Sequence, residues 1–330
     1  MTLNIAPIAL TGLSQMDNPF QTHFWASVKK MNGWDSRAFS YQINGAEYQV
    51  LILIKKIFLR FSIAYIPYGP EGIRNLKQLK LLSDSLKREL PKGCFFMRSD
   101  VPWVDSGETL PSGIKQTSYP IQPEGTVIVP LSGGPDEVFS QFRTRAKRNI
   151  RRSIDEIRIS EWKGDQKELK DWYETYTYTS LRDAFTPRSQ AYMKHILELG
   201  NDRSLGVESK LYIAWIGDSV IGGNIVLYTQ RRALYLFGAS RHEYVSASPS
   251  YALQWYTIQE AVKHGCELYD LYGIAPEDDE EHHLHSLNMF KTGFGGEKIF
   301  RAGCFDSVLN PFIYYLFRLV ETIHMASARG

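Results

Sequence analysis

The chain has 330 residues, of which 43% are hydrophobic and 22% are charged, and its formal net charge is +2. This length suits two ordinary cores better than one, and the composition excludes a disordered or fibrous chain. The near-zero net charge excludes a protein that coats nucleic acid with its whole surface, but it leaves room for a local basic patch.

The N-terminal segment and the cysteines indicate in which cellular compartment the protein is expected. The opening MTLNIAPIALTG has neither the basic start nor the long apolar run of a secretory signal, and no uncharged stretch approaches the ~20 residues that span a bilayer. Cys94, Cys266 and Cys304 are far apart and lack CxxC spacing, so we expect buried thiols rather than a disulfide framework or a zinc ribbon. A cytoplasmic protein is predicted.

The first part of the chain predicts a helix, a meander, a second helix and a strand. Apolar spacing and turn residues place the helices at 19–33 and 75–90, and the strands at 37–43, 47–54, 57–66 and 94–100. The breaks in the meander are expected at Asn44-Gly45 and at Lys55-Lys56.

The same order of elements recurs from near Val127. After a short strand and turn, a helix is predicted to start within 135–142 and to run to 157, followed by helices at 169–178 and 189–199. Three strands are expected within 210–240, then a helix at 249–264 and a strand at 266–274. The turns fall at Phe185-Thr186-Pro187, Gly217-Asp218 and 230–232. We therefore expect an α+β protein with two domains of similar topology, 1–126 and 127–305, with 306–330 returning to the first.

The last predicted helix, within 311–325, is amphipathic. Six apolar side chains share one face: Phe312, Tyr315, Leu316, Leu319, Val320 and Ile323. Because the opposite face is not strongly basic, we expect the apolar face to pack on the body of the protein rather than on a membrane.

The sharpest charge feature is the segment FRTRAKRNIRRS. Its basic residues are Arg143, Arg145, Lys147, Arg148, Arg151 and Arg152. Helical spacing gives the same segment an apolar stripe: Phe139, Phe142, Ala146, Ile150, Ile154 and Ile157. The basic residues form either a solvated helix face or a phosphate-binding face, whose partner is RNA or a diphosphate.

The remaining sequence patterns do not predict a metal, nucleotide or hydrolase site. His282, His283 and His285 follow acidic residues 277–281, but without a spaced distal ligand a solvated acidic loop is expected and no metal is predicted. No GxGxxG, GxxxxGK[ST] or GxSxG pattern is present, so no nucleotide cofactor and no serine hydrolase are predicted.

Several strings occur in a fixed order along nearly the whole chain. They are PFQTHFWASVK, IAYIPYGP, FRTRAKRNIRRS, RDAFTPRSQAY, SPSYALQWYTIQEAVKHG followed by YDLYGI, and LNMFKTGFGGE. Together they resemble the FemABX family of peptidoglycan-precursor aminoacyl transferases, in its compact type without a coiled-coil arm. The resemblance implies two GNAT-like (acyl-CoA N-acyltransferase-like) domains, each a mixed, mostly antiparallel sheet with flanking helices.

The resemblance also implies an activity. Such enzymes transfer an amino acid from aminoacyl-tRNA to an amine of UDP-MurNAc-pentapeptide or lipid II, building the interpeptide bridge of the cell wall. The resemblance further implies a monomer that needs no cofactor and that contacts the inner face of the membrane peripherally. Two alternatives stay open: an inactive RNA- or precursor-binding protein on this scaffold, and an N-acyltransferase with another donor or acceptor.

Family positions carry over to six residues. The precursor-binding positions fall on Lys29, Thr186, Arg188 and Tyr192, and the catalytic candidates are Lys291 and Asp100. Lys291 would stabilise an oxyanion or hold the donor's terminal phosphate, while Asp100 is a candidate base. The competing structural roles are an exposed helix lysine for Lys29 and an ion pair with Asp183 for Arg188.

Overall fold

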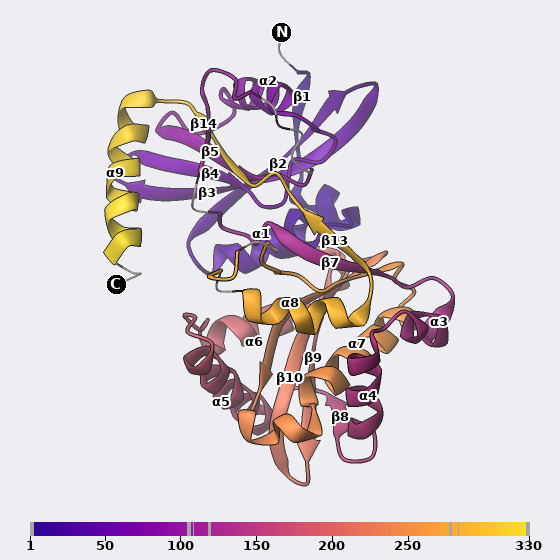
Figure 1. Cartoon of the computed structure of the whole chain (residues 1–330). Coiled ribbons are helices and arrows are strands. Elements are labelled where there is room, and N and C mark those ends of the chain that lie inside the picture. Colours follow the sequence, from indigo (N-terminus) through magenta and orange to yellow (C-terminus); the bar gives the residue numbers. More distant parts are fainter. Residues whose placement is uncertain are drawn as a thin grey trace. The chain divides into compact units, whose positions relative to one another are not determined.

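Two seven-stranded sheets organise the chain (Figure 1). The computed structural model describes residues 3–103, 107, 109–117, 120–276, 279–282 and 284–327, the side chains of 324–327 excepted. The chain divides into a first unit of Met1–Leu13, Phe20–Glu124 and Arg301–Gly330, and a second unit of Ser14–Pro19 and Gly125–Phe300. Short 3-10 helices lie at Leu10–Gln15, Pro19–Gln21, Arg203–Leu205, His242–Ala247 and Thr292–Phe294.

The first unit holds the sheet β1-β2-β3-β4-β5-β14-β6. Its strands are β1 (Ile5–Ile8), β2 (Trp34–Ile43), β3 (Ala46–Phe58), β4 (Phe61–Ile66), β5 (Cys94–Asp100), β6 (Ile114–Gln116) and β14 (Cys304–Val308). Its helices are α1 (His23–Lys30), α2 (Leu76–Leu86) and α9 (Pro311–Ser327). Among the strand pairs of the described residues in this sheet, β4–β5 alone is parallel, and α2 forms the crossover between these two strands.

The second unit holds the sheet β13-β7-β12-β11-β10-β9-β8. Its strands are β7 (Gly125–Pro130), β8 (Arg158–Glu161), β9 (Glu208–Ile216), β10 (Ser219–Tyr228), β11 (Arg232–Ser240), β12 (Leu268–Asp270) and β13 (Glu297–Phe300). Its helices are α3 (Gly134–Ser140), α4 (Thr144–Ser153), α5 (Gln166–Arg182), α6 (Gln190–Leu199), α7 (Pro249–Lys263) and α8 (His285–Lys291).

The two sheets repeat one pairing scheme. Read from β1 in the first unit and from β8 in the second, three antiparallel pairs are followed by one parallel pair and two antiparallel pairs. The crossover helix of the parallel pair is α2 in one unit and α7 in the other. The predicted α+β class, with two mixed and mostly antiparallel sheets, is confirmed.

Two glycines of β10 allow helices to pack closely against the second sheet. A Cβ on Gly222 would lie 3.1 Å from Leu253 of α7, and a Cβ on Gly223 would lie 2.5 Å from Trp172 of α5. Since successive residues of a strand point to opposite faces, α5 and α7 cover opposite faces of this sheet (Figure 1). Both helices approach the sheet closely because these two strand positions carry no side chain.

Two element boundaries differ from the sequence prediction. The expected break at Lys55-Lys56 is wrong, because β3 continues to Phe58 and the hairpin turns at Leu59, which has a positive φ of 46°. The helix expected to reach 157 ends at Ser153, whose hydroxyl donates to the carbonyl of Ile150 and so competes with helix continuation. Ile154 is therefore 62% exposed rather than part of the apolar stripe.

The C-terminal helix packs with the face opposite to the predicted one. The six apolar residues expected to pack inward are between 51% and 72% exposed. The residues that face the sheet include Tyr314 and Phe317, which contact Phe96, and the ion-paired Arg318 and Glu321. The expectation that the apolar face packs on the body is wrong, because buried charges on the sheet bind the polar side of α9 instead.

All three cysteines are buried and unpaired, as predicted. In the part of the chain that the structure describes, no helix combines the length and the hydropathy of a membrane-spanning segment.

Candidate functional site: the strand ends beside Lys291 and Asp100

In the second unit, the parallel strands β11 and β12 part after three paired residues. The last pair is Leu234 with Asp270. Asp270 is buried, and its carboxylate accepts hydrogen bonds from the Thr126 hydroxyl, from the Tyr272 backbone N–H at 2.9 Å and from Arg232 Nη1 at 3.0 Å. This carboxylate is paired and fully bonded, so it fixes the turn that leaves the strand.

Lys291 ends α8 and points at that same turn. Its Nζ donates to the carbonyls of Tyr272 and Gly273, at 2.7 Å for the latter, and lies 5.6 Å from the centre of the Tyr235 ring. Lys291 is 5% exposed, and burial lowers the pKa of its amine to about 7, although nearby Asp270 acts in the opposite direction. Near neutral pH this amine can therefore exchange a proton in either direction.

The basic helix α4 is attached to the turn that follows Lys291. The Arg143 backbone N–H donates to the Gly293 carbonyl at 2.9 Å, and Arg145 Nη1 lies 3.2 Å from Met289 Sδ on α8. Ala146 and Ile150 of α4 are buried, which turns the basic side chains outward. Within the described ranges, none of the six basic residues of this segment forms an ion pair, so their charge stays available to an anionic partner.

The predicted precursor-binding residues of the second unit lie between α5 and α6. Thr186 and Arg188 are exposed, whereas Tyr192 is buried, and burial raises its pKa to about 12. Asp183 pairs with Arg182 at 2.7 Å, so it does not neutralise Arg188, whose guanidinium lies 6.0 Å from the Tyr192 ring. The structure brings Arg188 and Tyr192 together.

The α5–α6 segment and Lys291 are held by different neighbours. The Tyr173 hydroxyl on α5 donates to the Arg188 carbonyl at 3.1 Å, whereas Lys291 is held by the turn after β12. Among the described residues, no hydrogen bond joins Lys291 directly to Arg188 or Tyr192.

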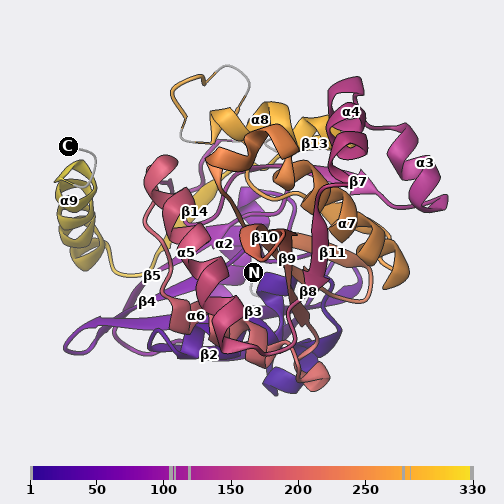
Figure 2. The same ribbon diagram turned by 90° about the horizontal axis from the view of Figure 1, so that it is seen from below.

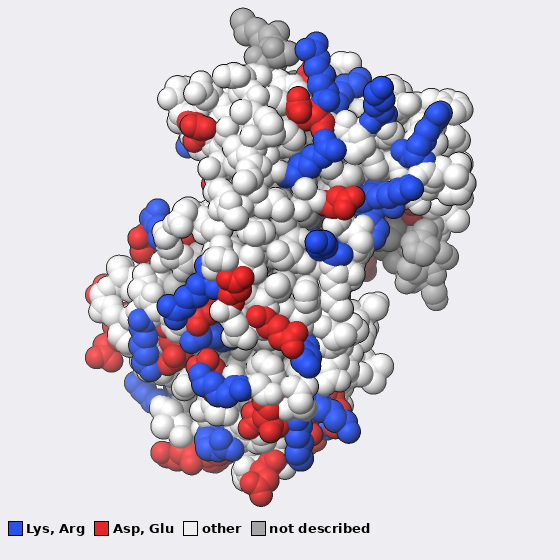
Figure 3. Space-filling view, turned by 180° about the vertical axis from the view of Figure 1, so that it is seen from behind, with Lys and Arg blue, Asp and Glu red and all other residues white. Residues whose placement is uncertain are grey.

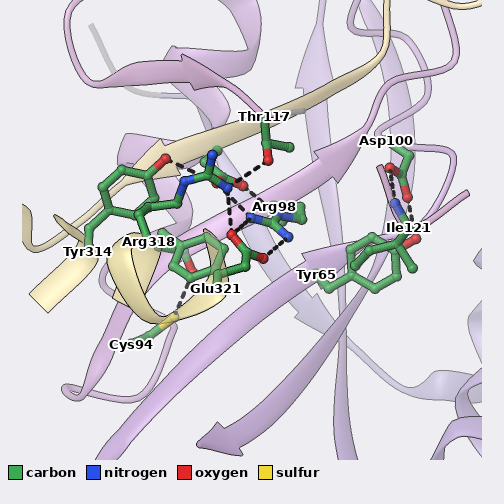
Figure 4. A network of polar contacts seen from close by, with 11 residues as sticks. Tyr65, Cys94, Arg98, Asp100, Thr117, Ile121, Tyr314, Arg318 and Glu321 are labelled. Carbon is green, nitrogen blue, oxygen red and sulfur yellow. Dashed lines mark hydrogen bonds and ion pairs between the residues drawn. The ribbon is translucent and has the colours of Figure 1, made fainter. Parts of the chain in front are cut away.

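In the first unit, Asp100 ends the second strand of the parallel pair β4–β5. The Tyr65 hydroxyl donates to its Oδ2, and the Ile121 N–H lies 3.4 Å from its Oδ1 (Figure 4). Asp100 is 3% exposed, and burial raises the pKa of its carboxyl to about 6, while the bonds from Tyr65 and Cys304 act against this rise. A carboxyl of this kind can serve as a base near neutral pH.

Lys29 lies in the first unit on α1. Its side chain is half-buried, and its Nζ lies 4.9 Å from the centre of the Trp25 ring. Beside it on the same helix, His23 and Lys30 help to line a surface hollow of about 430 Å³, together with Arg37 of β2. The helix thus offers positive charge beside a concave surface.

The acidic segment near 277–281 and the histidines after it are only partly described. Glu277, Asp278 and His283 lie outside the described residues. Among the residues that are described, no three His, Cys, Asp or Glu side chains gather in a way that would hold a metal ion.

Three polar partners escaped the sequence analysis. Arg232 was assigned to a turn, yet it binds Asp270 across 38 residues of sequence. Tyr65 and Thr126 each donate to a strand-end carboxylate, but Tyr65 lies within a predicted apolar strand and Thr126 lies just before the strand predicted from Val127. A hydroxyl within or beside an apolar strand is the only sequence signal that pointed to them.

Comparison with known proteins finds one family pattern and several transferases to which the chain is similar. The sequence pattern of the FemAB family matches residues 207–322. A lipid II:glycine glycyltransferase of Staphylococcus aureus (strain USA300) is 23% identical in an alignment that covers 90% of this chain and 89% of that protein.

Two solved structures share the fold. A crystal structure of FemX has a TM-score of 0.78 at 20% identity and covers 95% of this chain and 99% of its own. A tandem GNAT protein from the clavulanic acid biosynthesis pathway has a TM-score of 0.54 at 11% identity and covers 93% of this chain and 98% of its own. These matches support the resemblance to the FemABX family that the sequence predicted, and they confirm its fold: the chain is similar to a FemAB-family pattern over residues 207–322 and has a tandem GNAT-like architecture.

Proposed function

We propose that the protein is an aminoacyltransferase that adds an amino acid from aminoacyl-tRNA to an amine of a peptidoglycan precursor, and so builds the interpeptide bridge. The similar S. aureus protein carries the name lipid II:glycine glycyltransferase, which supports a precursor with a stem peptide as the acceptor. UDP-MurNAc-pentapeptide and lipid II both offer that peptide next to a diphosphate.

The observation that carries the proposal is the attachment of α4 to the turn after Lys291. The bond from Arg143 to Gly293 places a helix with outward arginines two residues from a buried amine whose pKa is about 7. RNA phosphates are bound by exposed arginine and lysine, and an amine with this pKa suits proton transfer at neutral pH. One unit therefore supplies both a surface for the donor and a group for the reaction.

The reaction is aminolysis of an ester. The acceptor nitrogen attacks the carbonyl carbon of the aminoacyl ester, a tetrahedral oxyanion forms, and the C–O bond to the ribose breaks. The attacking amine loses one proton and the ribose oxygen gains one. In its neutral form Lys291 accepts the first proton, and as an ammonium it returns a proton to the leaving oxygen. Because the ester is already activated, positioning supplies much of the remaining rate.

The acceptor's diphosphate needs positive charge. Arg188 suits it because its guanidinium is exposed and Asp183 is taken by Arg182. A planar guanidinium binds phosphate oxygens in pairs, which a lysine cannot do. Lys29 on α1 is the corresponding candidate in the first unit, and Asp100 remains the candidate base there.

The test is the mass of the product. The protein is incubated with separately charged tRNAs, and with UDP-MurNAc-pentapeptide or lipid II in parallel reactions. We expect the acceptor to gain the mass of one amino acid residue with at least one charged tRNA, and ribonuclease treatment of that tRNA to abolish the gain. No added mass with any charged tRNA contradicts the proposal. A gain that survives ribonuclease assigns another acyl donor.

A further inference from the structure

The helix α9 is fixed to the first unit through its charged side. Arg98 on β5 has a side chain only 6% exposed, and it binds Asp306 at 2.7 Å and Glu321 of α9 at 2.8 Å (Figure 4). On the same side of α9, Arg318 donates to the Thr117 hydroxyl at 2.8 Å, and Tyr314 donates to Asp306 at 3.1 Å. These bonds set the rotation of α9 about its axis, because turning the helix would leave buried charges unpaired.

The rotation of α9 directs apolar side chains into water. They recur at helical spacing and are more than half exposed: Phe312, Tyr315, Leu316, Leu319 and Val320. An amphipathic helix in water normally buries this stripe and exposes its charges. Exposed apolar stripes of this kind mark an interaction surface.

A second apolar element lies beside α9. Ile57, Phe58 and Leu59 form the tip of the β3–β4 hairpin, and all three are exposed. Leu59 occupies a left-handed turn position where Gly or Asn is the ordinary residue, so turn geometry does not explain its presence.

The hairpin and α9 share one hydrophobic cluster. Phe61 at the base of the hairpin lies 6.4 Å from Phe95, and Phe95 lies 5.4 Å from Phe317 of α9. Figures 1 and 2 show the hairpin and α9 on the same side of the first unit. The two exposed apolar elements therefore belong to one surface.

The polar rim of this surface is basic. Lys56 and Arg60 flank the hairpin tip, and Lys92 lies in the loop that touches it, since a Cβ on Gly93 would lie 1.7 Å from the Arg60 carbonyl oxygen. In the described part of the chain, none of these three cations pairs with a carboxylate. On the first unit, the face drawn in Figure 3 also carries more basic than acidic side chains.

We propose that this surface, formed by the outer face of α9, the tip 57–59 and the three flanking cations, binds an anionic lipid bilayer. Apolar side chains enter the headgroup region while lysine and arginine contact anionic headgroups. A second copy of the chain is a poorer occupant, because a symmetric dimer would bring two basic rims together. The proposal goes beyond the aminoacyl transfer, and its test needs no turnover, so either can fail without the other.

The test is flotation of the full chain with vesicles of phosphatidylcholine alone or with 30% phosphatidylglycerol. Wild type is expected to float with the anionic vesicles and to be released by salt. Leu316→Gln/Leu319→Gln/Val320→Gln is expected to weaken vesicle binding at least ~10-fold, because apolar contact with the bilayer is lost. Lys56→Gln/Arg60→Gln is expected to weaken it roughly 30-fold, at about one kcal/mol for each charge.

Matched controls carry the same kinds of change on the second unit. Leu181→Gln and Ile154→Gln alter side chains of similar exposure, and Lys167→Gln/Lys170→Gln removes the same charge from α5. These variants are expected to float like wild type. Equal circular dichroism and melting temperature of all variants check the fold.

Two results overturn the proposal. One is an absence of wild-type binding to anionic vesicles, or equal binding by wild type and the α9 variant. The other is a concentration-dependent dimer in sedimentation velocity that the α9 substitutions abolish while vesicles bind nothing, which assigns the surface to a second copy.

Discussion

The helices α4 and α9 follow equivalent strands of the two units, yet they turn opposite sides to water. In the second unit α3 and α4 come after β7, and in the first α9 comes after β14, each strand lying next to the second strand of the parallel pair. α4 buries Ala146 and Ile150 and exposes its arginines, whereas α9 exposes its leucines and places Glu321 against the sheet.

The difference shows that the packing partner decides which face of an amphipathic helix is buried. α4 packs on α7, which offers apolar side chains, so its apolar stripe is buried. α9 packs on a sheet that carries Arg98 and Asp306, so its ionic side is buried and its apolar side is left for another environment. The water-facing side of α4 suits phosphate, and that of α9 suits lipid.

The ends of the two parallel pairs differ in a similar way. Asp270 is bound by Arg232, whereas Asp100 faces the Tyr65 hydroxyl, and burial raises the pKa of Asp100 to about 6. The second unit therefore holds a fixed ion pair at its strand end with Lys291 beside it. The first unit holds a carboxyl that changes charge near neutral pH.

The largest effect is expected from Arg98→Met in the ionic contact of α9. The substitution leaves Asp306 and Glu321 buried without their cation, so we expect the free energy of unfolding of the first unit to fall by about 3–5 kcal/mol. Urea unfolding at pH 7 measures this loss, and protease cleavage within α9 should accelerate. In Arg231→Met, which breaks a pair whose arginine is 63% exposed, the loss should stay below about 1 kcal/mol. Equal losses would mean that α9 is not held by its charges.

The next largest effect is expected on the pH dependence of stability, which should differ between the strand-end carboxyls Asp100 and Asp270. The pKa of Asp100 is higher in the folded than in the unfolded chain, so the folded state binds more protons between about pH 4 and 6, and stability falls as the pH rises through that range. Asp100→Asn removes this loss, and we expect the variant to be more stable than wild type by up to about 3 kcal/mol at pH 7.5 and by little at pH 4.5.

Asp270→Asn provides the comparison. It removes the negative partner of Arg232, so we expect it to lower stability by about 2–3 kcal/mol at pH 7.5. Thermal unfolding of both variants at the two pH values measures the difference. A change of the same sign for both variants at pH 7.5 contradicts the contrast between the two strand ends.

The smallest effect concerns the outward charges of α4. Arg143→Gln/Arg148→Gln/Arg151→Gln should reduce the slope of log binding constant against log salt for tRNA by roughly 2–3, because each phosphate contact contributes about 0.7–0.9. Filter binding over a salt series measures the slope. The variant Lys163→Gln/Lys167→Gln/Lys170→Gln removes the same charge elsewhere and should keep the wild-type slope. An unchanged slope in the arginine variant would mean that the basic face of α4 is solvated and does not contact tRNA phosphates.

Local chemistry made much of the fold predictable from the sequence. Gly217-Asp218 ends β9, and Pro249 begins α7, as turn and helix-start residues do. The repeated order of elements then predicted two similar units. The hairpin tip was missed because Leu59 takes a left-handed conformation that its residue type does not indicate.

The features that could not be predicted depend on contacts between residues that are far apart in the sequence. The apolar stripe of α9 was recognised, but its direction depends on Arg98 and Glu321, which are 223 residues apart. Lys291 was named from the resemblance, and its lowered pKa depends on burial beside Tyr235 and the turn after β12, which lie elsewhere in the sequence.

The transfer rate of Lys291→Met tests the central claim most directly. Single-turnover transfer from a charged tRNA is followed from pH 6 to 8.5 in wild type, in Lys291→Met and in the exposed control Lys170→Met. We predict that Lys291→Met lowers the rate by about 10²–10³-fold and removes a rise centred near pH 7, while Lys170→Met matches wild type. A Lys291→Met variant with the wild-type rate and pH profile would contradict the account.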